Sequence, residues 1–111
     1  MFTTYTKIIL IKLHANWCEK SKSISQFYDS IQNRFDGKPI LFLDLNYTNQ
    51  QSTHQAELLI NLLGLSSVVK KNLETGKMLI IHKRSKKLLN KLENTLTFNE
   101  MESIVAKALK F

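Results

Sequence analysis

The chain has 111 residues, 43% of them apolar, which suits one compact domain over residues 1–111 and is too short for two. It contains one cysteine, so an internal disulfide is excluded, and no group of cysteine and histidine residues has zinc-site spacing. We therefore expect packing alone to hold the fold, with no metal and no bound cofactor.

The formal net charge is +7, from 16 basic against 9 acidic residues, and much of the excess lies in residues 68–77 and 82–87. Basic clusters favour acidic or phosphate-bearing partners. They are also an ordinary way to keep turns and sheet edges soluble. The sequence shows no DNA-binding motif and no aromatic residues interleaved with the lysines, so nucleic acid is not expected as a partner.

An apolar run near the N-terminus, residues 8–13, is short and is interrupted by Lys12. No small-residue cleavage site follows it, which argues against a signal peptide. No stretch approaches the roughly 20 apolar residues of a membrane span. We expect a soluble, cytoplasmic protein that does not contact a membrane.

The first half of the chain predicts a strand, a helix and a second strand. Residues 7–14 are apolar almost throughout, as in a central strand covered on both faces. A helix from residue 18 or 19 to residue 35 is indicated by apolar residues at helical spacing, namely Ile24, Phe27, Tyr28, Ile31 and Phe35. Gly37 ends this helix, and Pro39 opens a strand over residues 39–45.

The second half predicts a helix, two strands and a last helix. Polar residues 51–54 lead into a helix that Gly64 ends, and its expected inner face is Ala56, Leu59, Ile60 and Leu63. After a basic loop, residues 78–83 and 87–92 form a hairpin. Thr97 and Glu100 have the spacing of a capping box at the start of the last helix. The expected buried face of that helix is Phe98, Met101, Ile104, Val105, Ala108 and Leu109.

This order of elements predicts an α/β fold. The strand-helix-strand unit requires a parallel pair with a right-handed crossover, and the second half adds an antiparallel hairpin and a covering helix. The result is a four-stranded mixed sheet with helices on both faces.

Trp17 and Cys18 stand at the junction between the first strand and the first helix. This pair, within this order of elements, resembles the thioredoxin family over nearly the whole chain from Lys7 onward. The resemblance implies a thioredoxin-like fold. About half of the stretch that usually precedes the motif is absent, so we expect the first strand and helix of the full fold to be reduced or lost. The family's second cysteine is replaced by Ser21, which gives a W-C-x-x-S pattern.

In this resemblance Cys18 matches the attacking cysteine of the family and is the candidate catalytic residue. A helix N-terminus favours the thiolate, and Lys20 and Lys22 add positive charge nearby. Ser21 matches the resolving cysteine, and a hydroxyl cannot exchange with a disulfide. A two-cysteine reductase cycle within one chain is therefore excluded.

Two further candidates lie on the first strand. Lys12 falls where thioredoxins usually place a buried acid. It either supports the Cys18 thiolate from within about 4 to 6 Å or, as is commoner for such a lysine, extends its amine out of the end of the sheet. His14 either acts as a base or orienting donor to the thiol or is simply packed or solvated, which is the usual state of a lone histidine at a strand end.

The remaining candidates shape the surface beside the thiol. The resemblance gives this role to Trp17, for which the alternative is a partly buried anchor. Thr75 and Gly76 fall where the family has a cis-proline before its third strand. A cis bond without proline costs about 2.5 to 4 kcal/mol, so we expect this bond to be trans.

Two functions remain open from the sequence. The first is monothiol thiol-disulfide exchange, in which Cys18 forms a mixed disulfide with a protein or with glutathione, and glutathione serves as the co-substrate that releases it. The alternative is a redox-inactive binding module that holds a protein or peptide near Cys18. We expect a monomer, although a lone surface thiol can also link two chains.

Overall fold

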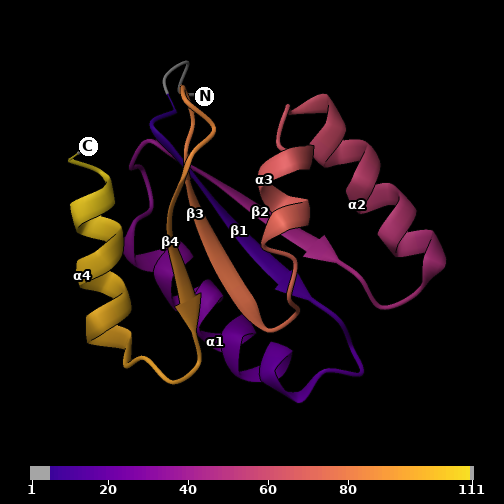
Figure 1. The fold of residues 1–111 in the computed structure, drawn as a ribbon. Coiled ribbons are helices and arrows are strands. Elements are labelled where there is room, and N and C mark those ends of the chain that lie inside the picture. Colours follow the sequence, from indigo (N-terminus) through magenta and orange to yellow (C-terminus); the bar gives the residue numbers. More distant parts are fainter. Residues whose placement is uncertain (1–5, 111) are drawn as a thin grey trace.

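The computed structural model describes residues 6–110, so residues 1–5 and 111 of the predicted single domain lie outside it. The elements are β1 (Ile8–His14), α1 (Glu19–Arg34), β2 (Ile40–Asn46), α2 (Gln50–Leu62), α3 (Ser66–Lys71), β3 (Lys77–His82), β4 (Leu88–Glu93) and α4 (Phe98–Ala108) (Figure 1). All four strands and α1 lie within one residue of their predicted bounds.

The strands form one mixed sheet in the order β2-β1-β3-β4. β1 runs parallel to β2 and antiparallel to β3, and β3 runs antiparallel to β4. Every residue of β1 from Ile8 to Leu13 is buried, because strands flank it on both sides and helices cover both its faces. The prediction of a four-stranded mixed sheet with a central first strand is confirmed.

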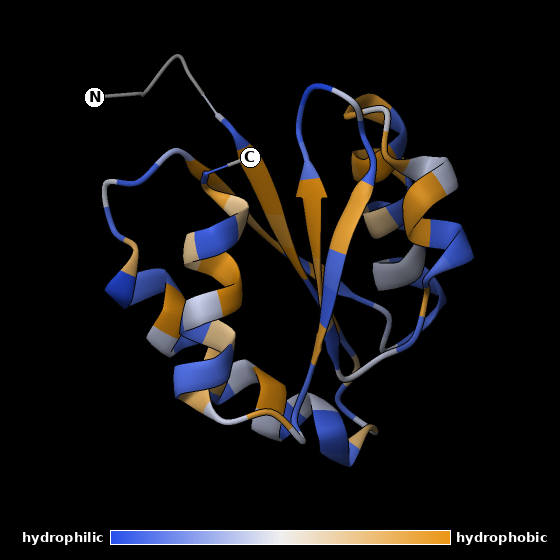
Figure 2. Cartoon of the chain, turned by 60° about the vertical axis from the view of Figure 1, so that its left-hand side comes forward, coloured by the Kyte–Doolittle hydropathy of each residue, from blue (hydrophilic) through white to orange (hydrophobic). Residues whose placement is uncertain are grey.

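Helices cover both faces of the sheet (Figure 1). Ile8 and Leu10 point to one side and pack with residues of α1 and α4, whereas Ile9 and Ile11 point to the other and pack with residues of α2 and α3. This alternation is the two-residue period of a strand that is buried on both faces. Figure 2 shows the hydrophobic colour concentrated in the central strands.

The segment after α2 was predicted as a loop, and this was wrong for residues 66–71, which form the short helix α3. Gly64 ends α2 with a φ of +73°. Leu65 and Val69 then lie four residues apart on the same side of the new turn, and both are fully buried. One apolar pair is too short a pattern to show helical periodicity among lysines and serines.

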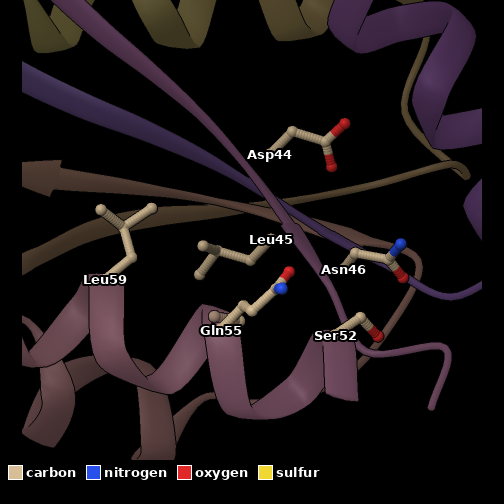
Figure 3. Close-up of a pocket in the computed structure, with 7 residues that line it drawn as sticks. Asp44, Leu45, Asn46, Ser52, Gln55 and Leu59 are labelled. Atoms are coloured by element: carbon tan, nitrogen blue, oxygen red, sulfur yellow. The ribbon is translucent and has the colours of Figure 1, made fainter. Parts of the chain in front are cut away.

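α2 differs from its prediction in two ways. It begins at Gln50, because the side chains and backbones of Asn49 and Ser52 form a capping box there. Leu59 does not belong to the buried face. It is 37% exposed and lines a hollow of about 250 Å³ between α2 and β2 (Figure 3). Ala56 and Ile60 are buried as expected.

The capping box predicted for α4 is confirmed. The Thr97 hydroxyl accepts from the Glu100 amide at 3.1 Å, and the Glu100 carboxylate accepts from the Thr97 amide at 2.9 Å. Met101, Val105 and Ala108 are buried on its inner face. Within residues 6–110, no helix has the length and apolar character that crossing a membrane requires.

Candidate functional site

Cys18 lies at the N-cap of α1, where the chain leaves β1 and turns into the helix. Its amide donates to the Ala15 carbonyl at 3.1 Å, and its carbonyl accepts from the Ser21 amide at 3.1 Å. The Cys18 side chain is partly exposed. These bonds fix a sulfur atom beside the unpaired amides of a helix N-terminus.

Several donors converge on the Cys18 sulfur. The Thr75 side chain makes the strongest contribution, and the Ser21 side chain and the Ser21 and Lys20 backbones add to it. Hydrogen bonds of this kind stabilise the thiolate. They lower the pKa of the Cys18 thiol below its ordinary value, against a smaller opposing effect of burial.

Ser21 connects the thiol to the end of β1. Its side chain is 1% exposed, and its hydroxyl oxygen accepts a hydrogen bond from the Ala15 amide at 3.1 Å. The same hydroxyl has one hydrogen, which it can donate to Cys18. Ser21 therefore holds the strand end and the first turn of α1 together, in addition to its contact with the sulfur.

Thr75 and Gly76 form the second wall of the site. The Gly76 amide donates to the Leu13 carbonyl at 2.7 Å, which binds this loop to the end of β1. Gly76 has a φ of +87°, and a Cβ atom built on it would lie 2.5 Å from the Lys20 Cβ. The loop thus packs directly on the first turn of α1. No peptide bond among the described residues is cis, so the expectation of a trans bond here is confirmed.

Trp17 is 67% exposed, so it is not the partly buried anchor that was its alternative role. Its indole nitrogen donates to the Thr48 carbonyl at 3.0 Å, and the neighbouring Asn16 amide donates to the Thr48 hydroxyl at 2.9 Å. The loop between β2 and α2 therefore orients the indole, while most of the ring stays accessible next to Cys18.

Lys12 lies beneath the site and is only 7% exposed, so the expectation that its amine extends out of the sheet is wrong. The amine donates to Asp44, 3.1 Å away and directly opposite on β2, and to the Ser25 hydroxyl at 3.1 Å. It also lies 5.0 Å from the centre of the Tyr28 ring. Cys18 is not among its partners. The ion pair with Asp44 directs the amine toward β2.

Solved structures share this architecture. A thioredoxin-like protein from Aeropyrum pernix aligns with a TM-score of 0.61 and 14% identity, over 95% of this chain and 80% of that chain. A thiol:disulfide interchange protein of the thioredoxin family from Chlorobium tepidum TLS gives 0.61 and 14%, over 93% and 80%. Thioredoxin-2 of the malaria parasite gives 0.59 and 16%, over 96% and 88%.

This chain has a thioredoxin-like fold. No protein-family profile and no curated protein matches its sequence, so the likeness lies in the three-dimensional structure. Within that fold, Cys18 and Ser21 stand at the junction of β1 and α1, and the Thr75–Gly76 loop faces them.

Asp44 was missed by the sequence analysis. Lys12 stands two residues before the end of β1, and Asp44 stands two residues before the end of β2. When two parallel strands begin and end at paired residues, positions at the same distance from their ends lie opposite each other. In this sheet Lys12 lies opposite Asp44. The matched offsets were the signal for this pair. Lys12 is connected to the site through Ser25. The Ser25 hydroxyl accepts from the Lys12 amine and donates to the Ser21 carbonyl at 2.6 Å.

Among the described residues, the His14 ring forms no hydrogen bond with the Cys18 thiol. Its Nε2 atom lies 3.0 Å from the Asn16 side-chain oxygen. Its Nδ1 atom is buried and lies 3.9 Å from Asp44. The structure thus supports the packed alternative for His14. Within residues 6–110, no three His, Cys, Asp or Glu side chains gather in a way that could hold a metal ion.

Replacing Asp44 with alanine is expected to lower the free energy of unfolding by about 1 to 2 kcal/mol, because the buried Lys12 amine loses its carboxylate. The loss is kept small by water, since Asp44 is 47% exposed. Urea unfolding at neutral pH measures it. Asp36→Ala, which removes an exposed acid, is the control. The double variant Lys12→Met with Asp44→Ala should regain most of the lost stability. If Asp44→Ala were as stable as Asp36→Ala, the role of Asp44 would be contradicted.

Proposed function

We propose that this protein is a monothiol thiol-disulfide exchange protein in which Cys18 forms mixed disulfides with a protein or with glutathione. The observation that carries the proposal is the environment of the Cys18 sulfur. It is partly exposed at the N-terminus of α1, and hydrogen bonds from Thr75 and Ser21 lower its pKa. The thiolate is the nucleophile in disulfide exchange.

The reaction needs two exchanges. In the first, the Cys18 thiolate attacks one sulfur of a disulfide, a bond forms between them, and the other sulfur leaves as a thiolate. In the second, the thiolate of an external thiol, for which we propose glutathione, attacks the substrate sulfur of the mixed disulfide. A disulfide forms between glutathione and that sulfur, and Cys18 leaves as a thiolate. No other cysteine exists in the chain to perform this second step. Over the two steps one substrate sulfur is released as a thiolate, the other ends in a disulfide with glutathione, and Cys18 is regenerated, so glutathione is the co-substrate.

The exposed ring of Trp17 supports a protein or peptide as the other partner. Large, exposed aromatic side chains beside a reactive group are typical of contact surfaces for proteins. We propose that the protein acts as a monomer in the cytoplasm, where thiols are kept reduced and glutathione is abundant. A disulfide between two Cys18 residues would then be a side reaction.

The same exposed Trp17 favours a second candidate, a binding module that holds a protein or peptide without exchange chemistry. In that case the fold would keep the contact surface and Cys18 would be an ordinary thiol. The two candidates differ in the reactivity of Cys18, because a binding module needs no stabilised thiolate.

The pH dependence of Cys18 alkylation by iodoacetamide separates them. We expect the apparent thiol pKa of the folded protein to lie below that of the same protein unfolded in urea, because the donors around the sulfur stabilise the thiolate. We expect Thr75→Val to raise this pKa towards the unfolded value, because it removes the largest contribution while keeping the shape of the side chain.

Ser21→Ala should raise the same pKa by less, which gives a graded comparison. If the folded and unfolded proteins show the same thiol pKa, the exchange proposal fails and the binding module becomes the better interpretation.

A further inference from the structure

A groove of about 590 Å³ lies between α3 and the start of β4, and lysines form much of its wall. Lys71 of α3 and Lys86 and Lys87 of the turn between β3 and β4 line it, together with Ser67, Val68 and Leu88. We call this feature the lysine groove. No acidic side chain lines it.

The two segments that build the groove carry positive charge only. Residues 64–73 and 82–89 contain no aspartate or glutamate, and their basic residues are Lys70, Lys71, Lys83, Arg84, Lys86 and Lys87. Only residues 74–81, most of which belong to β3, separate these segments in the sequence, and both segments contribute to the lining of the groove. Three of these six residues, Lys71, Lys86 and Lys87, line the groove, so their charges reinforce one another there.

The lysines of the groove differ from the structural cations of this protein. Lys12 pairs with Asp44, Lys77 pairs with Glu74 and Glu93, and Arg34 pairs with Glu102. No carboxylate of the described residues forms an ion pair with Lys71, Lys86 or Lys87. Lysines scattered over a convex surface would serve solubility alone, whereas these three lysines line the same hollow.

Lys86 is held in place toward the groove. It has a φ of +60°, which is uncommon for a residue with a side chain. Its amine donates to the Lys83 carbonyl at 2.6 Å. Its Cε atom passes 3.7 Å from the point where a Cβ on Gly64 would lie. An ammonium group has three donors, so two remain for a ligand.

The lysine groove lies at the opposite end of the sheet from Cys18. The Lys83 amide donates to the Lys7 carbonyl, just before β1, whereas the Gly76 amide beside the thiol site donates to Leu13 at the end of β1. Lys7 and Leu13 are six residues apart along the extended chain, which is about 20 Å at 3.3 Å per residue. A ligand in the groove would therefore not touch the thiol.

We propose that the lysine groove binds linked phosphate groups, either free polyphosphate or the phosphate chain of a nucleotide. Three lysines that line one hollow match an anion that carries several charges on adjacent groups. Ser67 also lines the groove, and its hydroxyl can serve as a further donor. Val68 and Leu88 provide an apolar surface on which the base of a nucleotide can pack.

Isothermal titration calorimetry of the reduced protein with inorganic tripolyphosphate, and separately with ATP, tests the proposal. We expect saturable binding that weakens as the salt concentration rises. Lys71→Gln combined with Lys87→Gln should weaken it at least about tenfold, given the strength of charge-assisted hydrogen bonds. Both lysines are exposed, so the double variant is expected to fold, as circular dichroism can verify.

The matched control is Lys107→Gln combined with Lys110→Gln, which removes the same charge from exposed positions at the C-terminal end of α4. It should change the affinity by less than about threefold, because only long-range attraction is lost. Equal affinity for tripolyphosphate and ATP would show that the phosphate chain alone is recognised. Tighter binding of ATP would assign the base to Val68 and Leu88.

Three results would overturn the proposal. One is no saturable binding of tripolyphosphate or ATP by the wild-type protein. Another is an equal loss of affinity in the two double variants, which would leave only net charge as the cause. The third is tighter binding of a single-stranded oligothymidine that both double variants weaken equally, which would indicate diffuse attraction to nucleic acid.

Discussion

Gly76→Ala is expected to lower the free energy of unfolding by about 2 to 4 kcal/mol, since it adds steric overlap to backbone strain. The new Cβ would lie 2.5 Å from the Lys20 Cβ and 3.2 Å from the Lys20 backbone carbon, in the first turn of α1. Because that turn carries Cys18, relief of the overlap should also displace the thiol from Thr75. Urea unfolding measures the first effect, and the pH profile of Cys18 alkylation measures the second.

Gly37→Ala is the matched control for this substitution. Gly37 also has a positive φ, +82°, but a Cβ on it would meet no atom within 4 Å. Gly37→Ala should therefore lower the free energy of unfolding only through backbone strain, by about 1 kcal/mol. It should leave the pH profile of Cys18 alkylation unchanged. If Gly76→Ala were no more destabilising than Gly37→Ala, the close packing of the Thr75–Gly76 loop on α1 would be contradicted.

The elements that the sequence predicted well are those whose signals are local and repeated. β1 could be identified as a central strand because seven consecutive residues are almost all apolar, and only a strand covered on both faces needs such a run. The start of α4 followed from two side chains three residues apart, Thr97 and Glu100, whose bonds depend on nothing else in the fold.

The elements that were missed depend on contacts across the chain. α3 is stabilised by the burial of Leu65 and Val69 against the sheet, and its surface of serine and lysine shows no periodicity. Leu59 has the spacing of an inner residue in α2, but whether it is covered depends on the distance between α2 and β2, where the hollow lies (Figure 3). Periodicity in one helix carries no information about that distance.

In the site, the sequence could identify the thiol but not its supports. The position of Cys18 at the start of α1 follows from the strand-to-helix junction alone. Placing Thr75 beside it required the family resemblance, since nearly 60 residues separate them. The pairing of Lys12 with Asp44, rather than with solvent, depends on the register between β1 and β2, which neither strand specifies by itself.

Ser21→Cys is expected to let the protein release glutathione from a mixed disulfide at Cys18, which the wild-type protein should retain. With wild-type protein glutathionylated at Cys18, the adduct should persist when no free thiol is added, because the chain holds no second cysteine. In the variant, the new thiolate would attack the Cys18 sulfur, form a disulfide with it and expel glutathione as a thiolate. Release should be at least about a hundredfold faster, since the attack becomes intramolecular.

We expect the side chain at position 21 to reach Cys18, because it lies one helical turn away and lowers the pKa of the Cys18 thiol. The substitution also removes the acceptor of the buried Ala15 amide, so we expect a loss of about 1 to 2 kcal/mol in stability when the variant is reduced. Ser23→Cys is the matched control, because it adds an exposed thiol five residues from Cys18, on another side of α1. Mass spectrometry of the adduct over time compares the three proteins. If Ser21→Cys retained glutathione, the side chains at positions 21 and 18 would not face each other. If Ser23→Cys released glutathione at the same rate as Ser21→Cys, release would not depend on where the second thiol lies.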